Sequence, residues 1–146
     1  MPEHPLVGTW NLVSSPIINE EGVKIGELLG PNPRGLLIYT DNGFMSAHLM
    51  SASRPQCKSN LLDKASSEEK VLAFNSSISY CGAYEILEDR VIHHVMASFF
   101  PNWVGTDLVR VIQLDGDLLT LTAPPITSKG SKVQAIWRRL DTNLQS

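Results

Sequence analysis

Residues 34–50 read RGLLIYTDNGFMSAHLM, and this stretch decides the fold class. Two mainly apolar segments, 34–39 and 44–50, flank the turn sequence Thr40-Asp41-Asn42-Gly43. Asparagine followed by glycine tolerates a positive φ at both turn positions, which is the backbone geometry of a tight hairpin. The stretch therefore predicts two antiparallel strands joined by a short turn.

Two further hairpins follow the same pattern. Residues 78–87 and 91–100 flank Glu88-Asp89-Arg90, and residues 108–114 and 118–122 flank Asp115-Gly116-Asp117. The sequence also indicates three single strands, and two glycines weaken the second of them. These strands are 9–13, 23–29 and 133–140.

One segment has helical rather than strand character. Ser66 precedes Glu69 by three residues, so each side chain can bind the backbone N–H of the other, as in a capping box. This pattern predicts one short helix over residues 67–75. The preceding polar stretch, 51–64, is expected to be a loop.

The arrangement of these elements indicates an all-β protein. About nine short strands joined mostly by tight turns are typical of a sandwich or a barrel. Strands do not alternate with long helices, which argues against a parallel α/β sheet. The 146 residues are of single-domain length, so we expect one domain over 1–146.

Composition excludes several classes of function. The formal net charge is −3 and no basic stripe is visible, so nucleic acid is not an expected partner. No apolar stretch is long enough to span a membrane, and no signal peptide is apparent, so a cytoplasmic location is expected. Cys57 and Cys81 are then expected to be free thiols. Without zinc spacing or a phosphate-binding glycine loop, no cofactor or metal is expected.

The first strand carries a resemblance to a known family. Gly8-Thr9-Trp10 gives the Gly-x-Trp pattern at the start of an all-β chain, which resembles the signature of the lipocalins and the wider calycin group. The chain is most similar to the small lipocalin-like domain proteins of bacteria and fungi, and the likeness covers residues 6–140. Four further segments carry it: GPNPRGLLIYTDNGFMSA (30–47), HHV (93–95), PNWVGT (101–106) and WRR (137–139).

The resemblance implies a closed or nearly closed antiparallel barrel of about 8–10 strands with one short helix and an internal cavity. It also implies that Trp10 packs at the barrel base under Arg138 or Arg139. Some barrels of this size act as cofactor-free isomerases or cyclases. The leading hypothesis is therefore such an enzyme, acting on an apolar polyketide or terpenoid metabolite.

The alternative is a binding or carrier protein for an apolar small molecule, without catalysis. A third reading is a barrel filled by its own side chains, with function on the outer surface. An exposed apolar edge could support a homodimer, but the sequence does not fix the oligomeric state.

Four residues are the candidates for acid–base chemistry. His93 and His94 are adjacent in a strand, so one should point into the barrel and the other away from it. Both strand faces are apolar, so the pattern does not say which. The inward imidazole could act as a general acid or base. Tyr39 and Tyr84 could hydrogen-bond a ligand carbonyl or hydroxyl, or simply reach solvent at the rim.

The remaining candidates are ligand contacts. Arg110 lies on an apolar face, where it would meet Asp107 or Glu85, or an anionic ligand group, unless that face is the wet exterior. Residues 101–105 (PNWVG) form a loop in which Trp103 clusters with Phe99 and Phe100, and we call it the aromatic loop. It is expected either to line the mouth of the cavity or to plug one end of the barrel. The full set of expected ligand contacts is His48, Phe99, Trp103, Asn102, Arg110 and Phe44.

Overall fold

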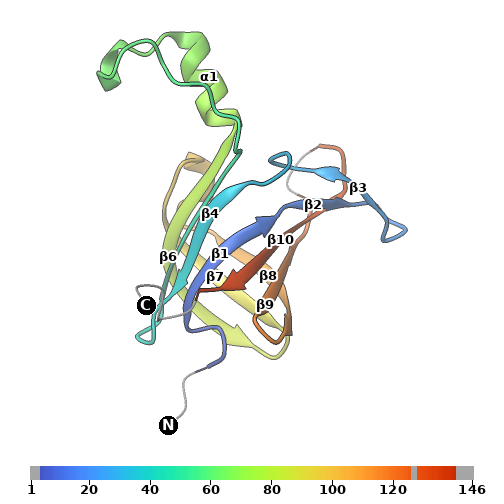
Figure 1. The fold of residues 1–146 in the computed structure, drawn as a ribbon. Coiled ribbons are helices and arrows are strands. Elements are labelled where there is room, and N and C mark those ends of the chain that lie inside the picture. Colours follow the sequence, from blue (N-terminus) through green and yellow to red (C-terminus); the bar gives the residue numbers. More distant parts are fainter. Residues whose placement is uncertain (1–3, 126–127, 141–146) are drawn as a thin grey trace.

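The computed structural model describes residues 4–125 and 128–140 and shows a closed barrel (Figure 1). Eight strands follow one another around the barrel in the order β1-β4-β5-β6-β7-β8-β9-β10, and β1 also pairs with β10. Their bounds are β1 Gly8–Ser14, β4 Arg34–Tyr39, β5 Phe44–Met50, β6 Ser77–Leu87, β7 Arg90–Ser98, β8 Asp107–Asp115, β9 Leu118–Ala123 and β10 Lys132–Arg139. The predicted all-β barrel is thus confirmed.

Closure depends on β1, which is hydrogen-bonded on both sides. Trp10 lies opposite Leu37 of β4 and opposite Arg139 of β10. The guanidinium carbon of Arg139 lies 4.2 Å from the centre of the Trp10 ring, and its Nη1 donates to the carbonyl of Val7. Of the two arginines that the sequence left open, Arg139 therefore covers the base, while Arg138 points to Asp117 on the surface.

A small hairpin branches from the barrel at Ser15. Strands β2 (Pro16–Ile18) and β3 (Lys24–Glu27) pair with each other, and β2 also pairs with β10. Buried Ser15 anchors the branch, because its N–H donates to Glu27 Oε1 and its Oγ accepts from the N–H of Leu29. The sequence analysis missed β2, since three residues beginning with a proline give no alternation signal.

The predicted strand 91–100 ends at Ser98 in the structure, and β7 contains a bulge before that end. The β6–β7 register shifts between Cys81 and Gly82, so that Met96 is an extra residue between Val95 and Ala97. Val91, His93 and Val95 are buried, whereas Ala97 is exposed, although simple alternation placed it on the same face as His93. The bulge reverses the alternation, and a β-bulge is not visible in the hydrophobic pattern.

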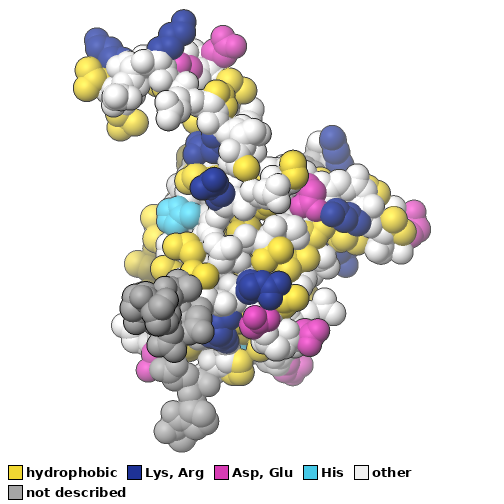
Figure 2. Space-filling model, viewed as in Figure 1, with side chains coloured by type: hydrophobic (Ala, Val, Ile, Leu, Met, Phe, Trp, Pro, Cys, Tyr) yellow, Lys and Arg dark blue, Asp and Glu magenta, His cyan; other side chains and the backbone are white. Residues whose placement is uncertain are grey.

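The predicted helix is present and stands away from the barrel (Figure 1). α1 (Ser67–Asn75) begins with the expected capping box between Ser66 and Glu69, and η1 (Leu62–Lys64) is a short 3₁₀ turn before it. We call residues 51–76 the arm. No residue of α1 is buried, and Figure 2 shows hydrophobic and charged side chains together on the arm's surface. In the described part of the chain, no helix could serve as a membrane span.

Candidate functional site

The interior of the barrel contains a cavity of about 60 Å³. Small and branched apolar side chains from β4, β5, β9 and β10 form most of its wall, and a few polar side chains interrupt it. The apolar residues include Leu37, Ala47, Leu49, Leu121 and Ala123. The polar or polar-tipped residues are Ser15, Tyr80, His93, Trp103, Arg110, Gln134 and Trp137. An apolar space with a few polar groups is the usual form of a small-molecule site.

His93 is the inward histidine, and two tyrosines hold its ring. The Tyr39 hydroxyl lies 2.6 Å from Nε2 and the Tyr80 hydroxyl lies 2.8 Å from Nδ1. Tyr39 comes from β4 and Tyr80 from β6, so the three side chains connect three separate strands across the barrel. His93 is 1% exposed. Both ring nitrogens therefore have partners inside the protein.

The environment keeps this network uncharged. Burial, and next the nearby Arg110 guanidinium, lower the pKa of His93 to about 3. Burial likewise raises the pKa of both the Tyr39 and the Tyr80 hydroxyls. At neutral pH the imidazole is thus neutral and both hydroxyls keep their protons.

Arg110 points into the barrel and is 9% exposed. The alternative that its side chain lies on the solvent-exposed outside of the barrel is therefore wrong. Its Nη1 donates to the carbonyl of Val109, and the guanidinium is close enough to the Tyr80 hydroxyl to act on its pKa. Neither carboxylate that the sequence offered as a partner reaches it, because Asp107 and Glu85 both bind His94 instead. Among the ion pairs of the described residues, none includes Arg110.

Trp137 contributes a second donor without a partner. The residue is 1% exposed and lines the cavity, and its Nε1 is buried without a hydrogen-bond partner among the described residues. Most buried polar atoms in proteins are hydrogen-bonded, so an unpaired indole N–H beside a cavity is unusual. Sequence analysis treated this residue only as part of the family likeness.

Four of the predicted site residues lie on the outer surface of the protein. His94 is on the outer face, where Nδ1 lies 2.6 Å from Asp107 Oδ1 and Nε2 lies 3.0 Å from Glu85 Oε1. These hydrogen bonds, the one to Asp107 first, raise the pKa of His94. His48 and Phe44 are exposed because they lie on the outward face of β5, and Asn102 is exposed because it lies in the aromatic loop.

Tyr84 supports the network from behind rather than lining the cavity. Its hydroxyl donates to the carbonyl of Thr40, and its ring meets the Tyr39 ring edge-on with centroids 4.8 Å apart. Tyr80, which the sequence analysis did not single out, shares the inward face with Tyr84 because the two are four residues apart on β6. This even spacing from Tyr84 was the signal in the sequence that could have identified Tyr80 as an inward-facing residue.

The aromatic loop forms the wall between the cavity and the surface. Trp103 lies in η2 (Pro101–Trp103) and makes edge-on contacts with Tyr80, Phe99 and Phe100, with centroids 5.5–5.9 Å apart. It lines the inner cavity and also an outer groove of about 250 Å³ that Phe74 of α1 helps to form. Trp103 and Phe99 are therefore at the mouth of the barrel.

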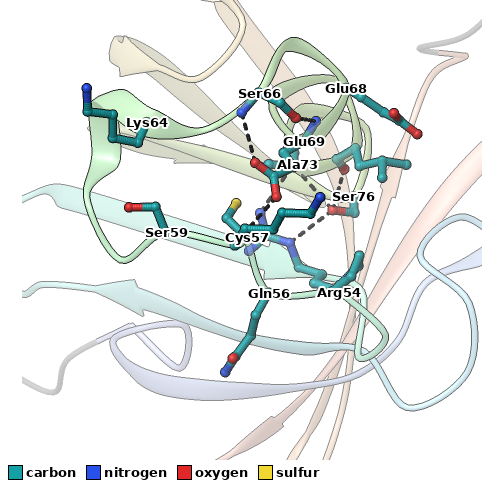
Figure 3. Close-up of a pocket in the computed structure, with 13 residues that line it drawn as sticks. Arg54, Gln56, Cys57, Ser59, Lys64, Ser66, Glu68, Glu69, Ala73 and Ser76 are labelled. Atoms are coloured by element: carbon teal, nitrogen blue, oxygen red, sulfur yellow. Dashed lines mark hydrogen bonds between the residues drawn. The ribbon is translucent and has the colours of Figure 1, made fainter.

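A larger hollow of about 660 Å³ lies on the arm, between residues 54–59 and α1 (Figure 3). Arg54 fixes its floor by donating to Ser76 Oγ and to the carbonyl of Ala73, and Glu69 accepts from the N–H of Lys58. Most of the residues that line it are exposed, and none of them is buried. Despite its size, this hollow excludes little water, so the barrel cavity is the better candidate for an apolar ligand.

Two known proteins are similar to this chain. A carrier protein from Aspergillus oryzae, named 4'-hydroxy-3'-methoxypropiophenone carrier protein ppsC, is 32% identical over 107 residues, covering 66% of this chain and 96% of that protein. A crystal structure of an uncharacterized protein from Bacteroides eggerthii covers 92% of this chain and 99% of its own at 13% identity. Its TM-score of 0.45 is too low to carry an argument.

The family model described as a lipocalin-like domain matches residues 7–140, which is nearly the whole barrel. This match includes the Gly8-Thr9-Trp10 strand and the arginine that closes the base. The chain therefore belongs to the lipocalin-like domain family.

Proposed function

We propose that this protein binds and carries a small, largely apolar molecule of the aryl ketone class inside the barrel. The observation that carries the proposal is the apolar cavity inside the barrel with its few polar groups. The relative named as a carrier of 4'-hydroxy-3'-methoxypropiophenone supports the ligand class, since that compound combines one aromatic ring with a ketone.

A carrier fits the geometry better than the isomerase or cyclase that the sequence analysis put first. A general acid or base needs a pKa near the working pH. The pKa of His93 is about 3, and both of its ring nitrogens are engaged by tyrosines. Catalysis by His93 remains a prediction, and it would require the tyrosine contacts to rearrange.

The cavity must enlarge to hold an aryl ring. Its volume of about 60 Å³ is below the roughly 300–1,000 Å³ of sites that enclose drug-sized molecules. Trp103 is the side chain best placed to move, because it is half-buried and separates the cavity from the outer groove. We infer that the ligand enters past Trp103 and replaces part of its packing against Tyr80.

The test is a binding titration of the protein with 4'-hydroxy-3'-methoxypropiophenone, followed by NMR. Ala47→Leu places a larger side chain on the cavity wall, and Ala97→Leu is the matched control on the exposed face of β7. We expect Ala47→Leu to weaken binding roughly 10-fold or more and Ala97→Leu to leave it unchanged. Equal affinities would place the ligand elsewhere.

Mass spectrometry of the same mixtures separates carriage from catalysis. A carrier returns the compound chemically unchanged after prolonged incubation. Conversion by the wild-type protein that His93→Asn abolishes would instead support the isomerase or cyclase hypothesis.

A further inference from the structure

We propose that the cavity selects a ligand with an anionic oxygen at one end, a carboxylate or an ionised phenol, which pairs with Arg110 and Tyr80, and a neutral acceptor oxygen that reaches the Trp137 indole N–H. This inference rests on the proposed function and specifies the ligand for the same site.

The cavity wall carries one positive charge, that of Arg110, without a carboxylate partner among the described residues. Arg110 is a buried guanidinium beside a mainly apolar cavity, and no ion pair of the described residues neutralises it. The neighbouring His93 is neutral and the neighbouring Tyr80 keeps its proton. A buried cation without a counter-ion is costly, so an anionic ligand oxygen is the group that this site stabilises most. A charge-assisted hydrogen bond is also the stronger kind.

The direction of the hydrogen bonds supplies a second donor. A neutral imidazole has one N–H and one acceptor nitrogen. The buried Tyr39 hydroxyl lies against Nε2, and it is satisfied when it donates there. Nδ1 then carries the hydrogen and donates to the Tyr80 oxygen. Tyr80 lines the cavity, so its own O–H is left to donate to a ligand oxygen beside Arg110.

The third donor comes from another strand of the barrel. Trp137 lies on β10 and Arg110 on β8, with β9 between them, and both side chains line the cavity. The unpaired Trp137 Nε1–H is therefore a separate donor for a second oxygen of the ligand.

The experiment uses three probes of similar size: 4'-hydroxypropiophenone, propiophenone and propylbenzene. The first has an ionisable phenol and a ketone, the second only the ketone, and the third neither. Absorbance follows the ionisation of the phenol while it is bound. We expect the bound phenol to ionise at a pH at least one unit lower than in water, because Arg110 stabilises the phenolate.

Arg110→Met should abolish that shift and weaken binding of the ionised phenol by about 10–100-fold, with little effect on propiophenone. Arg110→Lys keeps the charge and should keep most of the shift, which covers the case in which the methionine variant does not fold. Trp137→Phe should reduce the preference for propiophenone over propylbenzene.

The outcomes separate the two proposals. If all three probes bind equally and the bound phenol ionises as in water, the donor assignment is overturned while the carrier function stands. If no probe binds to the wild-type protein, the carrier function itself fails and this inference fails with it.

Discussion

Acid should destabilise the fold through His93, well before the carboxylates lose their charge. The imidazole has a pKa of about 3 in the folded protein and about 6.5 in the unfolded chain. Below pH 6.5 the unfolded state therefore binds a proton that the folded state rejects, and folding stability falls as the pH falls. From pH 7 to pH 5 this single group removes about 2 kcal/mol from the free energy of unfolding.

The assay is urea unfolding at several pH values between 7 and 5, for the wild-type protein and for His93→Asn. The wild type should lose close to 1.4 kcal/mol per pH unit at the acid end of this range, and the variant should lose much less. His94 works in the opposite direction, because its pKa is raised in the folded state, and its contribution is lost as the pH rises through that value. The same unfolding series on His94→Asn measures how much of the pH dependence comes from His94.

The same reasoning can be checked in the unaltered protein if the asparagine variant does not fold. The imidazole carbon resonances of His93 should not move between pH 7 and pH 5, whereas those of His94 should. A titration of His93 near pH 6.5, or equal pH slopes for wild type and His93→Asn, would refute the neutral, buried imidazole.

Three further changes test other parts of the structure. Gly82→Ala puts a Cβ 1.9 Å from the His94 carbonyl oxygen and should lower the free energy of unfolding by about 1–3 kcal/mol in thermal or urea unfolding. Gly26→Ala is the control, because its Cβ would have its nearest neighbour at 3.8 Å and should change the free energy of unfolding by less than about 0.5 kcal/mol. Similar costs for the two variants would contradict the close approach of the strands at Gly82. Ser66→Ala should cost α1 about 1 kcal/mol, seen as roughly fivefold faster amide exchange in the helix, while exchange in the barrel strands stays the same. Trp103→Ala should speed ligand association in stopped-flow measurements several-fold, and an unchanged rate would argue against entry at this mouth.

The fold could be predicted from the sequence because its signals are local. The Asn42-Gly43 turn and the Ser66 capping box each depend on a few neighbouring residues, and both are present in the structure. The sequence also limited the arginine over Trp10 to two adjacent residues. Choosing Arg139 required the register of β1 against β10, which no local pattern encodes.

The candidate site was only partly predictable, because it depends on which strand face is inside. Alternation could not orient His93 and His94, since the residues on both faces are apolar, and the Met96 bulge breaks the period of two. The pairing of His94 with Asp107 and Glu85 is a contact across strands, and it leaves Arg110 without the carboxylates expected for it. The unpaired Trp137 Nε1 becomes visible only when its surroundings are known.

A crystal structure of the protein with 4'-hydroxy-3'-methoxypropiophenone tests the central claim most directly. We predict that the aromatic ring lies inside the barrel between Leu37 and Leu121, with one ligand oxygen at Arg110 and Trp103 displaced from its position against Tyr80. A ligand found only in the hollow of the arm, beside an unchanged barrel interior, would contradict the account.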